Sequence, residues 1–112
     1  MPLLQNVGVF GTRTRSNALL VTHMLGASHA SELSAVLGVS LSQAQLAIDS
    51  LERARLLVGA MEGSARRVRL NPRFPAKDEL SALLDKLALV SPELQDRLAE
   101  IRRRPRRGRK PL

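Results

Sequence analysis

The sequence predicts a mainly helical α+β fold, in which five helices accompany one small two-stranded β-hairpin. Apolar residues recur at helical spacing in five stretches of the chain. Between the third and fourth stretches, residues 57–70 contain a segment that alternates apolar and charged side chains beside a glycine-containing loop, which is typical of a hairpin. The 112 residues, 44% of them hydrophobic, suffice for one compact core and are too few for two full-sized domains.

Glycines are expected to end the first two helices. Residues 12–25 carry apolar side chains at helical spacing, and Gly26 follows them. Residues 30–37 are expected to form a shorter helix, which Gly38 ends by adopting the left-handed conformation.

The third helix has the clearest start. Ser40 and Gln43 form a capping box, because the serine hydroxyl accepts from the amide of Gln43 while the glutamine side chain reaches back. We expect this helix to cover about residues 40–57 and to bury one stripe of side chains, namely Ala44, Ile48, Leu51 and Ala54.

The hairpin and two further helices complete the expected fold. Residues 57–61 and 66–70 form the two strands. The fourth helix covers about residues 76–90. A serine followed by proline and glutamate at 91–93 starts the fifth, which ends at Pro105.

The chain carries 18 basic and 10 acidic residues, and the excess lies at one end. Residues 1–96 hold ten basic and nine acidic side chains, whereas residues 97–112 hold eight basic and one acidic. A second basic cluster surrounds the hairpin, opposed in the nearby sequence only by Glu62, and comprises Arg53, Arg55, Arg66, Arg67, Arg69 and Arg73. This distribution suits a polyanionic partner, with nucleic acid as the first candidate.

The order of elements from residue 10 to residue 74 is a helix, a helix-turn-helix pair and a β-ribbon. The residues that carry a family resemblance are Ser31-Glu32-Leu33, Leu37-Gly38-Val39-Ser40, Ile48, Leu51, Glu52, Ala54, Leu56-Leu57, Glu62-Gly63 and Arg69-Leu70-Asn71-Pro72. With these residues the chain resembles winged helix-turn-helix DNA-binding regulators of the ArsR/MarR type. We therefore expect a winged helix-turn-helix domain in residues 1–74, two C-terminal helices in 75–104 and a basic disordered tail in 105–112.

The resemblance implies that the helix over 40–57 enters the DNA major groove and that the hairpin tip contacts the flanking backbone or minor groove. A helix fits the major groove, and the amides at its start can bind phosphate. The candidate DNA-binding residues on its exposed face are Ser40, Leu41, Ser42, Gln43, Gln45 and Leu46. Its first ten residues contain no Arg or Lys, and Asp49 faces the expected phosphate. The alternative is that Leu41 and Leu46 dock another protein.

The wing and the tail supply the expected cationic contacts. Arg66, Arg67 and Arg69 form a basic strand that suits phosphate, although charge on an edge strand also prevents aggregation. Residues 105–111 resemble an AT-hook, a minor-groove-binding segment, except that Lys110 follows the Arg-Gly-Arg core where that motif has proline. The tail residues concerned are Arg106, Arg107, Arg109 and Lys110, which suit either minor-groove insertion or plain phosphate attraction.

The leucines of the last two helices suggest a homodimer. The residues expected at its interface are Leu80, Leu83, Leu84, Leu87, Leu94 and Leu98. Such a dimer would present two recognition helices about 34 Å apart, one turn of DNA. The alternative is that these leucines fold back onto the first helix of the same chain.

Several function classes are excluded. The chain has no cysteine, and His23 and His29 are poorly spaced for a metal, so no metal or other cofactor is expected. No catalytic triad spacing or phosphate-binding glycine loop occurs, so we expect no enzyme. No apolar run approaches the roughly 20 residues of a membrane span, and the first residues do not form a secretory signal.

The leading hypothesis is a cytoplasmic, nucleoid-associated transcriptional regulator that binds double-stranded DNA, most simply as a repressor. The alternative is a protein–protein adaptor that uses the winged helix as a docking module and the tail as a nonspecific nucleic-acid tether. A third possibility, an RNA-binding protein, is disfavoured because only 2% of the residues are aromatic.

Overall fold

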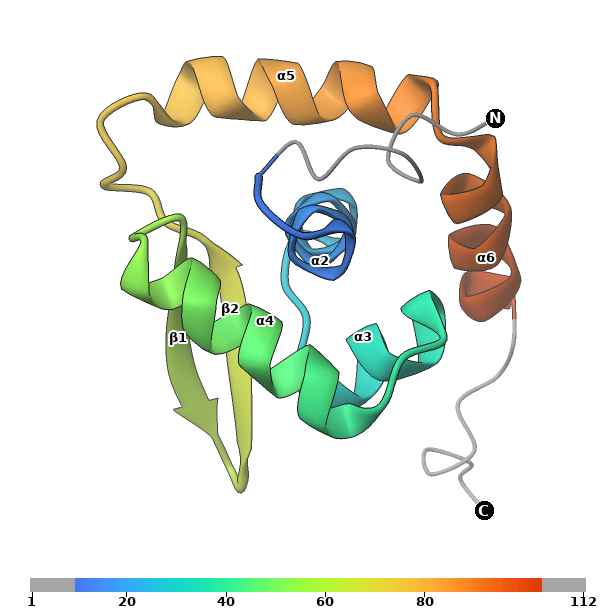
Figure 1. Cartoon of the computed structure of the whole chain (residues 1–112), viewed down its shortest axis with the longest axis horizontal. Helices are drawn as coiled ribbons and strands as arrows, with labels where there is room; N and C mark the ends of the chain where they lie inside the picture. Colours follow the sequence, from blue (N-terminus) through green and yellow to red (C-terminus); the bar gives the residue numbers. More distant parts are fainter. Residues whose placement is uncertain (1–9, 104–112) are drawn as a thin grey trace.

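The computed structural model describes residues 10–103, and within them it shows a mainly helical fold with one two-stranded antiparallel sheet (Figure 1). The predicted fold class is confirmed, and the arrangement is compatible with a winged helix. In chain order the elements are α2 (Arg13–Leu25), α3 (Ala30–Leu37), α4 (Leu41–Arg53), β1 (Leu57–Glu62), β2 (Ala65–Leu70), α5 (Lys77–Leu89) and α6 (Pro92–Arg103). No helix in this part of the chain is both long enough and apolar enough to cross a membrane.

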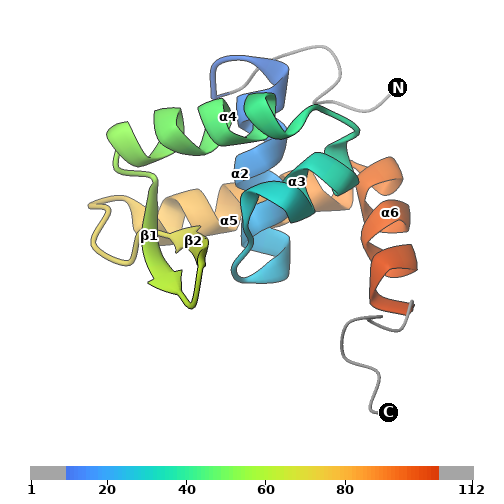
Figure 2. The same cartoon turned by 90° about the horizontal axis from the view of Figure 1, so that it is seen from below.

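Helix α2 lies at the centre of the fold. Figure 1 shows it end-on, with α4 and α5 on opposite sides, and in Figure 2, seen from below, α5 lies behind α2. Six of the seven residues from 16 to 22 in α2 are buried, namely Ser16, Ala18, Leu19, Leu20, Val21 and Thr22. A helix that is covered on several sides needs no narrow apolar stripe, and this explains why polar Ser16 and Thr22 are buried with the leucines.

Side-chain caps start the first three helices. Thr12 Oγ1 accepts from the amide of Arg15 at 3.0 Å, and His29 Nδ1 accepts from the amide of Glu32 at 3.4 Å. The predicted capping box of α4 is present, since the Gln43 amide donates to Ser40 Oγ and the Ser40 amide donates to Gln43 Oε1, each at 3.1 Å. Each contact satisfies an amide that a helix start leaves without an intrahelical partner.

Helix α4 ends at Arg53, so the prediction that it extends to residue 57 is wrong. Arg55 takes the left-handed conformation with φ 68°, and its amide donates to Glu52 O at 3.0 Å while the Leu56 amide donates to Leu51 O at 3.0 Å. This pair of bonds is the Schellman ending that usually contains glycine. Ala54, predicted to lie in the buried stripe, is exposed because the helix has already ended there.

Strands β1 and β2 form the predicted hairpin, in a register that runs from Leu57 opposite Leu70 to Glu62 opposite Ala65. The two-residue turn has Gly63 at its first position with φ 65°, as a type II′ turn requires. A single bridge adds a third segment to the sheet. The Ser28 amide donates to Val68 O at 2.9 Å, and the Val68 amide donates to Ser28 O at 2.8 Å.

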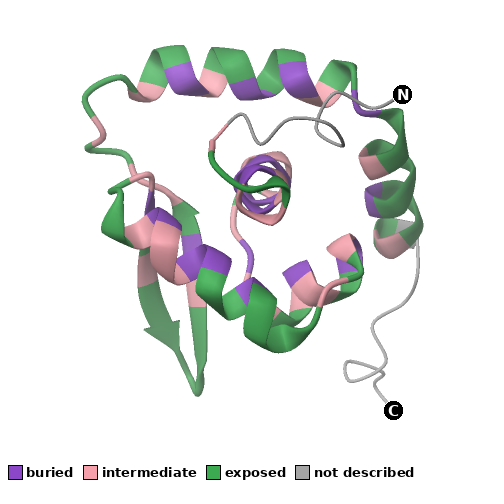
Figure 3. Cartoon of the chain, viewed as in Figure 1, coloured by how far each residue is buried: buried purple, intermediate pink, exposed green. Residues whose placement is uncertain are grey.

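The C-terminal helices belong to the same hydrophobic core as the rest of the fold, α5 packs against α2, and Figure 3 shows buried residues along α5 in purple. Of the six leucines expected at a dimer interface, Leu94 is half-buried against the core and only Leu83 is exposed. The other four, Leu80, Leu84, Leu87 and Leu98, are buried within the chain itself. The expected dimer face is therefore wrong for these four, because the hydrophobic core of the chain itself covers them.

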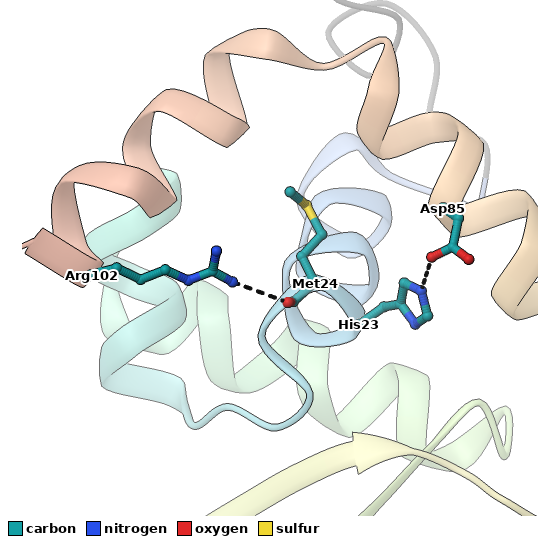
Figure 4. A network of polar contacts seen from close by, with 4 residues as sticks. All are labelled: His23, Met24, Asp85 and Arg102. Atoms are coloured by element: carbon teal, nitrogen blue, oxygen red, sulfur yellow. Dashed lines mark hydrogen bonds and ion pairs between the residues drawn. The ribbon is translucent and has the colours of Figure 1, made fainter.

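Polar contacts also tie α5 and α6 to α2 (Figure 4). His23 Nε2 on α2 lies 2.7 Å from Asp85 Oδ1 on α5, and Arg102 Nη2 on α6 donates to the carbonyl of Met24 at 3.3 Å. Arg97 on α6 donates to the carbonyl of Val36 on α3 at 2.6 Å. The arginine contacts satisfy carbonyl groups near the ends of α2 and α3, which have no partner within their own helix.

Candidate nucleic-acid interface

The outer face of α4 is exposed over its first half, as the helical phase of the sequence predicts. Leu41, Ser42, Gln43, Gln45 and Leu46 are all exposed, and the opposite side of the helix buries Ala44, Ala47, Ile48 and Leu51. Leu46 retains 66% of its accessible surface. Amide, hydroxyl and apolar groups therefore alternate on one solvent-facing surface.

Two open grooves flank this face. We call the hairpin of β1 and β2 the wing. The wing-side groove, of about 520 Å³, lies between α4, the start of α3 and the wing. Its lining includes His29, Ser31, Gln45, Met61, Ser64 and Arg66. The α2-side groove, of about 420 Å³, lies between α4 and the start of α2, and its lining includes Thr12, Thr14, Gln43, Leu46 and Ser50. The exposed face of α4 is thus a ridge with a groove on each side.

Sequence reasoning missed four of these groove residues, Thr12, Thr14, His29 and Ser31. They stand at or beside the starts of α2 and α3, far in sequence from α4. Their position near the starts of predicted helices gives no information about which other helix they face.

Arg66 is not the free cation that the sequence indicates. Its guanidinium lies 3.0 Å from Asp49 Oδ1 and 3.3 Å from Glu52 Oε1, both on α4. Glu62 is the only acidic residue within the sequence of this cluster, but folding places two further carboxylates from α4 beside the wing. Arg67 lies 3.6 Å from Glu62, its neighbour near the hairpin tip.

The other arginines of the cluster do not lie on the face of the wing that meets α4. Opposed residues of an antiparallel pair share a face, so Arg67 and Arg69 share the face of Ala60 and Val58, away from the face on which Arg66 meets α4. Within residues 10–103, the side chains of Arg53, Arg69 and Arg73 have no carboxylate partner and are exposed. Arg13, Arg55 and Lys86 are also exposed without a carboxylate partner in residues 10–103, and together these six cations are available to a polyanion.

Gly59 allows the wing to lie close to α4. A Cβ atom at this position would lie 2.5 Å from Glu52 Oε2 and 3.3 Å from Val68. Because Glu52 also pairs with Arg66, the carboxylate spans from α4 to both strands. The wing and α4 are therefore held as one rigid surface.

The predicted tail contacts, Arg106, Arg107, Arg109 and Lys110, lie outside the described residues, as does the AT-hook-like segment. The helix that leads to them is described, and in Figure 1 α6 runs toward the lower side of the molecule, where the wing tip and the start of α4 also lie. The bond from Arg97 to Val36 fixes α6 against α3 in this orientation.

Among the described residues, no group of three or more histidine and acidic side chains is arranged to hold a metal ion. His29 caps α3 and His23 contacts Asp85, so each histidine has a structural partner. Comparisons of the chain with protein-family models, with curated proteins and with solved structures found no match.

Proposed function

We propose that the chain binds double-stranded DNA as a transcriptional regulator, most simply a repressor, with α4 in the major groove. The observation that carries the proposal is the exposed ridge of α4 between two open grooves. A major groove about 12 Å wide admits one helix, and the two phosphate backbones that border it need space on either side of that helix. The two grooves supply this space.

The groove walls carry suitable partners for phosphate. His29, Ser31 and Ser64 line the wing-side groove, and Thr12 and Thr14 line the α2-side groove. Hydroxyl groups and helix starts commonly bind backbone phosphates and so fix the position of a protein on the duplex. On the ridge itself, Ser42 and Gln45 suit hydrogen bonds to base edges, and Leu46 suits a thymine methyl group.

Most of the affinity is expected from cations outside the ridge. Arg53, Arg69 and Arg73 are exposed without a carboxylate partner in residues 10–103, and the last 16 residues of the chain hold eight further basic side chains. Phosphate neutralisation releases counterions and gives a salt-dependent, sequence-independent affinity. The sequence resemblance to ArsR/MarR-type regulators supports the same division between a reading helix and positioning cations.

The decisive test places the same isosteric change on and off the ridge. Gln45→Glu adds a negative charge to the exposed face of α4. Gln95→Glu adds the same charge to exposed α6 and also removes the bond that Gln95 Nε2 donates to the carbonyl of Ala88, so circular dichroism first checks that this variant is folded. We expect Gln45→Glu to weaken binding of the full chain to a selected duplex about tenfold, and Gln95→Glu to change it less than about threefold. Fluorescence anisotropy at several salt concentrations measures both affinities.

Equal effects of the two substitutions would show that α4 does not approach DNA. The adaptor alternative would then be preferred, and one observation already favours it. The only cation on the α4 side of the wing is held by Asp49 and Glu52, and exposed Leu41 and Met61 lie beside it in the wing-side groove. A surface with neutralised charge and exposed apolar groups suits a protein partner.

A further inference from the structure

Of the two edges of the wing's sheet, the described residues provide a partner only for the edge of β2. The amide and carbonyl of Val68 both bond Ser28, at 2.8 and 2.9 Å, on the side of β2 that faces away from β1. In an antiparallel strand both backbone groups of a residue face the same way, and the direction alternates along the strand. Arg67 and Arg69 therefore bond β1, where they lie opposite Ala60 and Val58.

The backbone groups of Gly59 and Met61 consequently point away from β2, along what we call the outer edge of β1. Within residues 10–103, no hydrogen bond from another segment reaches these groups. In Figure 1, none of the described elements runs alongside β1 on the side away from β2. The Met61 side chain next to this edge is 64% exposed, so the edge is open to solvent.

β1 lacks the features by which proteins usually protect an open edge. Such strands commonly carry lysine or proline, or a bulge that twists the edge away. β1 reads Leu-Val-Gly-Ala-Met-Glu, without a cation or a proline, and it pairs with β2 without a bulge from residue 57 to residue 62. The three arginines of the wing lie on β2 instead. An open apolar edge of this kind can accept a further strand through its main-chain groups.

The side chains around the outer edge define the chemistry of such a strand. On one face of the sheet, Val58 and Ala60 are short, and Arg67 and Arg69 lie behind them on β2. Arg69 has no carboxylate partner in residues 10–103, and Arg67 has only the exposed pair with Glu62 at 3.6 Å. Strands lie about 4.8 Å apart, so acidic side chains of an added strand can meet both guanidinium groups across the short residues.

We propose that the outer edge of β1 binds an extended segment of a partner protein, antiparallel to β1, in which apolar and acidic residues alternate. Apolar residues of this segment lie opposite Gly59 and Met61 and exchange both backbone hydrogen bonds with them. The acidic residues between them lie on the other face of the sheet, beside Arg67 and Arg69. The proposal goes beyond DNA binding, because these hydrogen bonds and ion pairs involve no residue of α4.

The test uses a short labelled peptide in which valine and glutamate alternate, titrated into the full chain and followed by fluorescence anisotropy. We expect saturable binding. The same peptide with lysine in place of glutamate should bind at least about tenfold more weakly, because it brings like charge to Arg67 and Arg69.

Methylation of the peptide backbone separates strand addition from charge attraction. In the proposed register the valine amides face β1, so N-methylation of the valines should weaken binding at least about tenfold. N-methylation of the glutamates gives a peptide of the same composition but removes the amides that face away from β1. This control should change the affinity less than about threefold.

A substitution in β1 tests the same hydrogen bonds from the protein side. Met61→Pro removes an outward amide and leaves the bonds to β2 in place, as proline on an edge strand does, whereas Met61→Leu keeps the amide. We expect Met61→Pro to weaken peptide binding about tenfold and Met61→Leu to change it less than about threefold. Circular dichroism checks that both variants are folded. Hydrogen exchange needs no variant, and the peptide should protect the amides of Gly59 and Met61 in the unaltered chain.

Absence of saturable binding by the valine–glutamate peptide would overturn the proposal, as would binding that N-methylation of the valines does not weaken. Protection of the Gly59 and Met61 amides by rising concentration of the chain alone would assign the outer edge to a second copy instead. Protection of the same amides by duplex DNA would assign it to nucleic acid, and either result would overturn the proposal. A chain that binds the peptide but no duplex would count against the proposed function alone.

Discussion

Helices α4 and α5 have the same length, 13 residues, and lie on opposite sides of α2, yet they face solvent with different chemistry. The outer face of α4 presents amide and hydroxyl groups between two grooves. The exposed side of α5 presents Leu83 and Leu89 among charged residues, namely Asp78, Glu79, Asp85 and Lys86.

The comparison shows that amphipathic spacing identifies the buried side of a helix and leaves its outer side undetermined. Both helices bury a regular apolar stripe, Ala44, Ile48 and Leu51 on α4 and Leu80, Leu84 and Leu87 on α5. The exposed residues therefore have to be considered separately, and they are mainly amide, hydroxyl and leucine side chains on α4 and mainly charged and leucine side chains on α5.

The largest expected effect is on stability, and it tests whether α4 and α5 share one hydrophobic core. Ile48→Ala on α4 and Leu84→Ala on α5 each remove a fully buried side chain. Each should lower the free energy of unfolding by about 2–5 kcal/mol, since each leaves a cavity. Urea denaturation followed by circular dichroism should show one transition for both variants, whereas two transitions for Leu84→Ala would mean that α5 and α6 fold as a separate unit.

A smaller effect separates the two outer faces by charge. Asp49→Asn removes a carboxylate from the side of α4 next to the wing and loosens its hold on Arg66. Under the proposed function, duplex affinity should rise about three- to tenfold. Asp78→Asn on α5, where the side chain is 95% exposed, removes the same charge far from α4 and should leave the affinity unchanged. Anisotropy titrations at one salt concentration compare the two, and an equal rise would indicate a general charge effect.

The starts of α4 and α5 differ in capping, and substitutions there should change the free energy of unfolding by about 1 kcal/mol or less. α4 begins with a full capping box, whereas Ala76 before α5 provides no side-chain cap. Ser40→Ala should therefore lower the free energy of unfolding by about 1 kcal/mol. Ala76→Ser should raise it by less than about 0.5 kcal/mol, because the backbone of Ala76 is not in the extended conformation that a capping residue uses. Thermal melts measure both shifts, and a large gain for Ala76→Ser would contradict this explanation.

The smallest expected effect concerns the end of α4. Arg55→Gly relieves a left-handed conformation that a Cβ atom disfavours, although glycine also makes the unfolded chain more flexible. We expect the free energy of unfolding to rise by about 0.5 kcal/mol. The same denaturation experiment detects the change, and a loss of stability would show that the Arg55 side chain makes a compensating contact.

Local signals predicted most of the fold correctly. The cap at Ser40, the left-handed Gly38 and the glycine turn at Gly63 each act over four residues or fewer, so the sequence alone reveals them. The end of α4 was predicted wrongly because Arg55 takes the left-handed conformation, which usually requires glycine and is not indicated by an arginine in the sequence.

Signals that depend on distant residues were missed. Arg66 forms ion pairs with Asp49 and Glu52, which are 17 and 14 residues earlier in the chain, and no sequence pattern predicts these contacts. A leucine stripe looks the same whether it packs on α2 or on a second copy, so the stripe of α5 could not reveal its partner. The exposed face of α4 was predictable because helical phase determines it once the buried stripe is known.

The bridge between Ser28 and Val68 has a consequence for the order of folding. These residues are 40 positions apart, with α3, α4 and the first strand between them. Local helices form before such distant pairs close, because closing a long loop costs entropy that only the finished contacts offset. We therefore expect the sheet to complete last, so that protection of the Val68 amide from hydrogen exchange marks the moment at which the whole chain has folded.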